Sequence, residues 1–216
     1  MLNLTELKRV LQSKLDVVEP RPLASGTHIK STTVFPSRKN DASLTCESLI
    51  QVHACLYLEQ DQETAAYVTR PFVLYSEKTK IRFIPDVLAV NREGFYRIYL
   101  LVRPDAPASP IPHRVEILKS VLDTIPVQIL LLDINRLVSR AKMHNLRYMY
   151  HQAYGGSPEG GATVVHLLKS KFDSQATIAA LIAQGAHAAD VSFALFHHLI
   201  EANLEKPLTP RTVCRV

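Results

Sequence analysis

The sequence predicts an α/β fold followed by a small, mostly helical domain. Three strand-like runs follow one another in the middle of the chain, at residues 67–75, 80–91 and 96–103. A helix predicted over 113–124 then leads to VQILLLD at 127–133, an apolar run with the length of a buried strand. A strand, a helix and a further strand in this order indicate a crossover within one sheet.

The composition is that of a globular chain with a sizeable core. Of the 216 residues, 47% are hydrophobic and 21% are charged, which excludes a disordered or low-complexity protein. Twenty-five Lys and Arg against 20 Asp and Glu give a net charge of +5, a mild bias toward polyanions such as nucleic acid. The sequence contains neither an apolar run of the roughly 18 residues that a membrane span needs nor a signal peptide, so we expect a cytoplasmic protein. Three scattered cysteines without a CxxC pair favour free thiols over disulfides or a zinc site.

The chain is expected to have three parts, separated by changes in composition. A helix predicted from Leu4 to Leu15 opens the first part, and the Gly-rich segment YGGSPEGGA before residue 163 marks the last boundary. These parts are an N-terminal helix and basic arm (1–42), an α/β domain (43–152) and a C-terminal domain (163–216).

Local sequence patterns predict the helices at the two ends of the α/β domain and the elements of the C-terminal domain. Ser43 and Thr45 are candidate N-caps for the first helix of the α/β domain, and a helix from Asn135 to about Tyr150 is expected to close that domain. After residue 163 the pattern predicts two short helices and a β-like tail. This order is typical of a small winged-helix or helix-turn-helix module.

The strongest chemical signal is a Pro-Asp pair inside the apolar strand IRFIPDVLAV. In metal-dependent nucleases of the PD-(D/E)xK class, such an aspartate binds Mg²⁺, and residues two apart on the next strand supply a second acid and a lysine. Asp86 occupies the position of the aspartate. The next strand offers Leu101 and Arg103 instead, so the second carboxylate is missing.

A longer segment around this pair, CESLIQVHACLYLEQDQETAAYVTRPFVLYSEKTKIRFIPDVLAV, resembles the N-terminal domain of the TnsA-type transposon endonucleases. That family shows a Glu-Ser-x-x-Glu helix, a Gln-Pro-Phe strand, a Tyr-x-Pro-Asp-Phe strand and a Val-Lys strand end. HLIEANLEKPLTPRTVCRV is similar to the end of its C-terminal domain, so the resemblance covers most of the chain. It implies a restriction-endonuclease-like core, a mixed sheet flanked by helices, with a small winged-helix-like domain.

The resemblance also implies an activity and its partners. TnsA-type proteins nick DNA at transposon ends with Mg²⁺, beside a DDE-type transposase subunit and an ATPase regulator. The family's catalytic residues fall on Gln51, Asp86 and Arg103, and the metal ligands on Asp86 and the carbonyl of Val102. Two of the three catalytic residues depart from the pattern, because Gln51 is neutral and an arginine does not position water as a lysine does. Glu47, one helical turn before Gln51, is the expected substitute for the helix acid.

Two functions therefore stay open. The chain is either a subunit that binds transposon-end DNA and nicks it, or a catalytically inactive nuclease fold that binds DNA or a transposase; a defence or regulatory protein is a more distant alternative. Asp86 has a purely structural interpretation as a strand-end cap or as a partner of Arg103. Glu47 has one as an acid favoured by the helix dipole. With its missing ligands, the isolated protein is expected to cleave DNA poorly or not at all.

Overall fold

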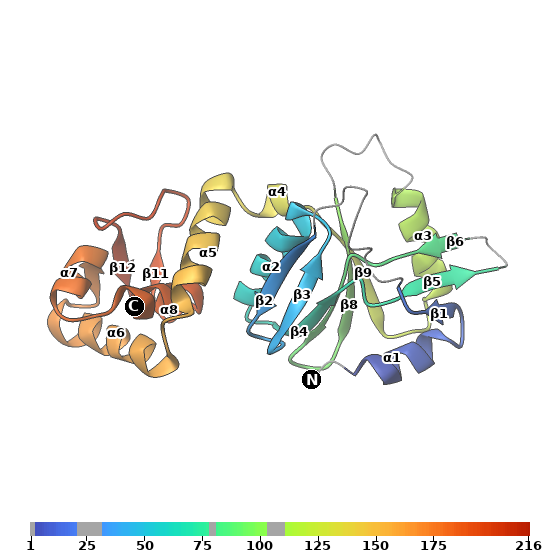
Figure 1. The fold of residues 1–216 in the computed structure, drawn as a ribbon, viewed down its shortest axis with the longest axis horizontal. Coiled ribbons are helices and arrows are strands. Elements are labelled where there is room, and N and C mark those ends of the chain that lie inside the picture. Colours follow the sequence, from blue (N-terminus) through green and yellow to red (C-terminus); the bar gives the residue numbers. More distant parts are fainter. Residues whose placement is uncertain (1–2, 21–31, 78–80, 103–110) are drawn as a thin grey trace. The chain divides into compact units, whose positions relative to one another are not determined.

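The computed structural model divides the chain into two compact units, residues 1–134 and residues 135–216 (Figure 1). The expected α/β class is confirmed by a mixed four-stranded sheet with helices in the first unit. The division precedes the Gly-rich segment, which lies inside the second unit. Among the helices of the described ranges, none combines the length and apolarity that crossing a membrane requires. The residues that the structure describes are 3–20, 32–77, 81–102 and 111–216.

The central sheet of the first unit has the strand order β4-β7-β8-β9. β4, β7 and β8 are antiparallel, and β9 pairs with β8 in parallel, which confirms the crossover expected through the helix α3. A tight turn joins β7 to β8: Gly94 has φ of 90°, and Asn91 Oδ1 accepts hydrogen bonds from the N–H groups of Glu93 and Phe95. The elements are β4 (Thr64–Thr69), β7 (Val87–Asn91), β8 (Tyr96–Leu101), α3 (Ile111–Val121) and β9 (Val127–Leu132).

Two of the three predicted strands, 67–75 and 80–91, are each split into two shorter strands. Pro71 and Pro85 lie at the breaks and have no N–H group to donate to a strand ladder. Arg70, just before Pro71, has φ of 47°, which turns the chain out of the central sheet. The pieces that leave the central sheet form a second sheet of order β1-β5-β6, made of β1 (Asp16–Val18), β5 (Val73–Ser76) and β6 (Ile81–Phe83).

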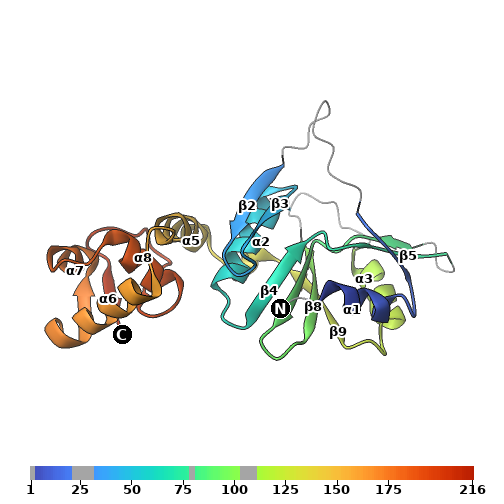
Figure 2. The same cartoon turned by 60° about the horizontal axis from the view of Figure 1, so that its bottom comes forward.

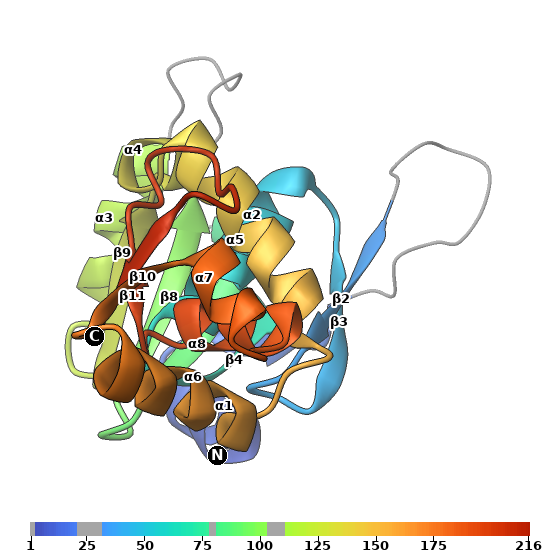
Figure 3. The ribbon, with the colours of Figure 1, turned by 90° about the vertical axis from the view of Figure 1, so that its left-hand side faces the viewer.

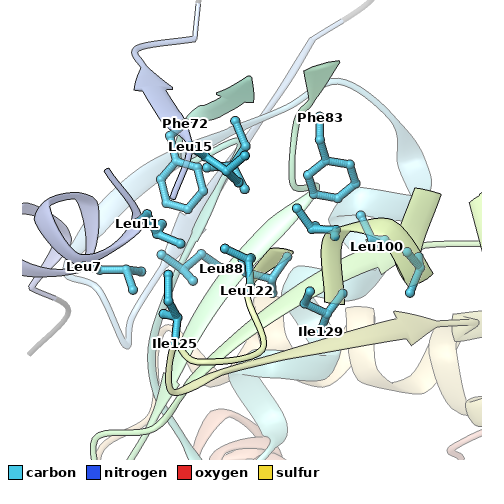
Figure 4. Packing of buried hydrophobic residues seen from close by; sticks show 14 residues of the cluster. Leu7, Leu11, Leu15, Phe72, Phe83, Leu88, Leu100, Leu122, Ile125 and Ile129 are labelled. Atoms are coloured by element: carbon cyan, nitrogen blue, oxygen red, sulfur yellow. The ribbon is translucent and has the colours of Figure 1, made fainter. Parts of the chain in front are cut away.

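One face of the central sheet is covered by α3 and by the N-terminal helix α1 (Leu4–Leu11), which ends earlier than predicted (Figure 4). Alternation along β8 sends Ile98 and Leu100 into this core. Full burial of a leucine such as Leu11 stabilises the fold by about 2 kcal/mol. The main contributors to this core are Leu7, Leu11, Leu15, Phe72, Leu74, Phe83, Leu88, Leu118, Leu122 and Ile129.

The opposite face carries the helix α2 (Leu49–Gln60) and a β-hairpin of β2 (Thr33–Ser37) and β3 (Ala42–Cys46) (Figure 2). The hairpin corrects the predicted arm, since residues 33–46 pair in an antiparallel register. Ser43 and Thr45 lie in β3 and are not caps. The N-cap of α2 is Ser48, whose side chain accepts a hydrogen bond from the N–H of Gln51.

A buried carboxylate, Glu59 of α2, joins the hairpin to the central sheet. It accepts hydrogen bonds from the hydroxyl of Ser37, from the hydroxyl of Tyr67 at 2.8 Å and from the backbone N–H of Lys39 at 3.4 Å. Only 2% of Glu59 is exposed. Because an unpaired buried charge is costly, these donors hold β2, α2 and β4 in one arrangement.

Lys39 closes the other end of the same network. Its ammonium donates to the carbonyls of Leu58 and Thr64, each at 2.7 Å, and to that of Asp61, so it caps the C-terminal end of α2. Burial lowers the pKa of Lys39 to about 8, and the nearby carboxylate of Glu59 only partly offsets this shift.

We therefore predict that Lys39 makes folding stability increase with pH above 8. Between its folded pKa of about 8 and its ordinary value of 10.5, the unfolded chain binds more protons at this amine, so the free energy of unfolding rises with pH. Denaturant unfolding of wild type and Lys39→Met at pH 7.5 and 9.5 measures this, because other titrating groups cancel in the difference. A difference that stays constant or shrinks with pH contradicts the prediction.

The second unit consists of helices around a small sheet of order β10-β12-β11 (Figure 3). A short helix, α4 (Ile134–Leu137), lies at the division between the units. The helices are α5 (Arg140–Ala153), α6 (Pro158–Lys171), α7 (Ile178–Ala183) and α8 (Ala188–Phe196), and the strands are β10 (Gln175–Thr177), β11 (Glu201–Ala202) and β12 (Val213–Arg215).

Two features of the second unit differ from the sequence-based expectation. The helix predicted to close the α/β domain is α5, and it packs on α8 within the second unit. The Gly-rich segment is not a linker throughout, because Gly160 and Gly161 lie inside α6, which Ser157 caps. A Cβ atom on Gly160 would come within 1.9 Å of a carboxylate oxygen of Asp190 in α8, so the glycine permits close helix packing.

Candidate functional site

Asp86 is held rigidly at the start of β7. Its carbonyl accepts the N–H of Arg70 at 3.1 Å, and its own N–H donates to the carbonyl of Tyr99 at 3.2 Å. One oxygen of its side chain accepts the N–H of Leu101 at 2.9 Å. The sequence-predicted aspartate therefore lies beside the C-terminal end of β8, where the resemblance would put a second acid.

The start of α2 brings the two other predicted groups together. Gln51 is 1% exposed, and its side-chain oxygen accepts the backbone N–H of Glu47 at 2.6 Å. The pair resembles a capping box, but the side chain of Gln51 accepts the N–H of Glu47, one residue before the N-cap Ser48. The side-chain oxygen of Gln51 therefore holds the chain that leads into α2. Glu47 precedes α2 and is not on its face as expected.

The carboxylate of Glu47 forms an ion pair with Arg70. One of its carboxylate oxygens lies 3.1 Å from a guanidinium nitrogen of Arg70, and both side chains are more than four-fifths buried. Since the N–H of Arg70 also bonds to the carbonyl of Asp86, a continuous set of contacts runs from α2 through Arg70 to Asp86. We call Glu47, Gln51, Arg70, Asp86 and Leu101 the Asp86 cluster.

The other predicted positions complete the description of this region. Val102 follows β8 directly, and its N–H donates to the carbonyl of Leu132 in β9 at 3.1 Å. Leu101 is 2% exposed and apolar, so it adds no ligand. Arg103 lies outside the described residues, and its catalytic and DNA-binding roles stay predictions.

The residues of the Asp86 cluster do not fit the Mg²⁺ site that the resemblance implies. A hard divalent cation takes several oxygen ligands, carboxylates above all. The carboxylate of Glu47 is neutralised by Arg70, and the oxygen of Gln51 already accepts a hydrogen bond. Within the part of the chain that the structure describes, no group of three or more His, Cys, Asp or Glu side chains is placed to hold a metal.

Sequence reasoning missed Arg70, although a signal for it was present. The Gln-Pro-Phe strand that the resemblance implies would fall on Arg70-Pro71-Phe72, which puts a cation at the position of a neutral side chain. The Ser48-x-x-Gln51 spacing of a capping box was also visible and assigns a structural role to Gln51. Buried thiols lie nearby, with the Sγ atoms of Cys46 and Cys55 3.8 Å apart, and all three cysteines are free, as expected.

No family model and no curated protein matches the chain.

We predict that Glu47 and Arg70 stabilise the fold as a pair. Arg70→Gln leaves a largely buried carboxylate without its counter-ion, and we expect it to lower the free energy of unfolding by about 1–3 kcal/mol. Glu47→Gln is expected to cost a similar amount. The double variant should cost less than the sum of the two, with a coupling of about 1 kcal/mol or more in a denaturant-based double-mutant cycle. Additive effects would mean that the ion pair contributes nothing.

Proposed function

We propose that this protein is a DNA-binding subunit of a transposition machinery, with an endonuclease-like fold whose catalytic cluster no longer cuts DNA. The observation that carries the proposal is the ion pair of Glu47 with Arg70 beside Asp86. The carboxylate of Glu47, the expected substitute for the helix acid that would help Asp86 bind a metal, is instead neutralised by a guanidinium. An internal cation thus takes the place of the divalent ion that such a fold would use.

Three further observations support the endonuclease-like part of this proposal. The first unit has a mixed sheet with helices on both faces, which is the architecture that the TnsA resemblance requires. Asp86 lies next to the end of β8, as the Pro-Asp motif needs. The second unit has the order α6-β10-α7-α8-β11-β12 with β12 central in its sheet, which fits a winged-helix-like domain.

Such a subunit would bind DNA and help to assemble the other proteins of the transposition machinery on it. A DDE-type transposase would cut and join the strands, and an ATPase regulator would be a further partner. The net charge of +5 favours duplex DNA as a ligand, and Arg103 is the strand residue proposed to contact a phosphate. Mg²⁺ is not needed for these roles.

The first test is of binding without cutting. Wild-type protein should bind duplex DNA with little sequence preference and with an affinity that falls steeply as salt increases. Arg103→Ala should weaken this binding. Fluorescence anisotropy on labelled transposon-end and random duplexes, together with a nicking assay on supercoiled plasmid in Mg²⁺ or Mn²⁺, measures both properties. Metal-dependent nicking by wild type that disappears in Asp86→Ala would show that the protein is an active nuclease.

The second test restores the family's residues. We expect Gln51→Glu combined with Arg70→Gln and Arg103→Lys to bind Mn²⁺ and to nick plasmid DNA, because the variant gains a carboxylate at the helix and loses the guanidinium that competes with the metal. The matched control is the same triple variant with Asp86→Ala, which should neither bind Mn²⁺ nor nick. If a folded triple variant does not bind Mn²⁺, as measured by calorimetry, the assignment of Asp86 to the metal position is wrong.

A further inference from the structure

A basic groove lies on the second unit, between β11, β12 and the loop that joins them at residues 203–212. Its volume is about 640 Å³. Lys206, Arg211 and Arg215 contribute three positive charges to its lining, and Glu201 is the single acid there. The remaining lining residues are uncharged, and threonine and asparagine side chains among them can donate hydrogen bonds. We call this feature the C-terminal groove.

The positive charge of the protein is concentrated in this unit. Residues 135–216 contain nine Lys and Arg against five Asp and Glu, a net charge of +4. The first 134 residues contain 16 Lys and Arg together against 15 Asp and Glu, a net charge of +1. The mild overall bias toward polyanions is therefore a strong bias of the smaller unit.

The loop of the groove is held in one shape by a buried asparagine. Asn145 of α5, 2% exposed, donates its side-chain N–H groups to the carbonyls of Leu204 and Lys206, both at 2.8 Å, and accepts the N–H of Leu208 at 3.2 Å. The amide side chain thus uses both of its ends on the backbone of the loop. Lys206 is thereby presented from a fixed backbone.

The second half of the loop is also fixed. The first N–H groups of α7, from Ile178 and Ala179, donate to the carbonyls of Thr212 and Pro210 at 2.9 and 2.8 Å. The N–H of Arg211 donates to the side chain of Thr209 at 3.2 Å, within a tight turn. A loop whose backbone is already ordered loses little conformational entropy when it binds a ligand.

The helix that a helix-turn-helix module would use to read bases is poorly suited to that role here. In such modules the second helix enters the major groove of DNA, and its N-terminal residues contact base edges. The corresponding helix, α8, is buried from Val191 to Phe196 and packs against α5 and α6 of its own unit. Its more accessible first turn, Ala188–Asp190, carries no basic side chain and one acid, which favours another surface of this unit for contact with DNA.

We propose that the C-terminal groove binds the phosphate backbone of duplex DNA, with Asn145 as the residue that positions its loop. This inference rests on the proposed DNA-binding function and assigns it a surface. Lys206, Arg211 and Arg215 neutralise phosphates without reading bases, which gives affinity with little sequence preference. Glu201 lies opposite Arg215 in the β11–β12 pair and opposes binding.

The experiment compares two triple variants of the full chain with equal loss of charge. The groove variant removes the three cations of the lining, by Lys206→Ala, Arg211→Ala and Arg215→Ala. The control variant removes three exposed cations of the same unit that do not line the groove, by Arg140→Ala, Lys169→Ala and Lys171→Ala. Anisotropy with a random duplex at several salt concentrations should show the groove variant binding on the order of 100-fold more weakly at 0.1 M salt. The slope of log affinity against log salt should fall by about 2.7, and the control should stay near wild type.

A variant that binds DNA more tightly provides an independent check, because a folding defect would weaken binding and not strengthen it. Glu201→Gln removes the opposing charge, and we expect it to bind duplex DNA about three- to tenfold more tightly. If the two triple variants lose the same amount of DNA affinity, or if the groove variant loses none, the C-terminal groove is not the binding surface, although the protein still binds DNA. A wild type that does not bind DNA even at low salt would overturn the proposed function itself. Preference of the groove for duplex RNA of the same sequence would overturn its assignment to DNA.

Discussion

The buried carboxylate of Glu59 is the constraint on which the arrangement of the first unit depends. A charge with so little exposure is tolerable only while its donors stay in place, and these donors come from the hairpin and from β4. The hairpin, α2 and the central sheet must therefore assemble together. The start of α2, with Glu47 and Gln51, is brought next to Arg70 and Asp86 by that assembly.

In the Asp86 cluster, the carboxylate of Glu47 is neutralised by a residue of the protein itself, Arg70. The two units of the chain differ in how much net charge they carry. An arginine fork satisfies a carboxylate with fixed geometry and never loses its proton, so it is a permanent counter-ion, whereas a metal exchanges with solvent. The first unit is nearly neutral, with a net charge of +1, whereas the second unit has a net charge of +4. An excess of positive charge of this kind favours contact with a polyanion.

Much of this structure follows from the sequence, and the errors have identifiable causes. The strand-like run at 96–103 predicted β8, and the apolar run at 127–133 predicted the crossover strand. Propensity did not reveal the β2–β3 hairpin, because its short strands carry polar residues and are stabilised through Glu59, which is distant in sequence. The Asp86 cluster was predicted in part. Asp86 follows from its motif, but the partner of Glu47 depends on the turn at Arg70, which only tertiary pairing determines.

The glycines around α6 limit how the protein can be engineered. A Gly-rich stretch such as YGGSPEGGA is where one would ordinarily insert a tag or exchange a domain, since exposed loops accept insertions well. Here the positions touch a neighbouring helix: a Cβ on Gly156 would come within 2.6 Å of the carbonyl oxygen of Ala189, and one on Gly160 would collide with Asp190. Asp190 also accepts the N–H of Ser157, the cap of the same helix. Fusions and circular permutations in this segment would break the packing of the second unit.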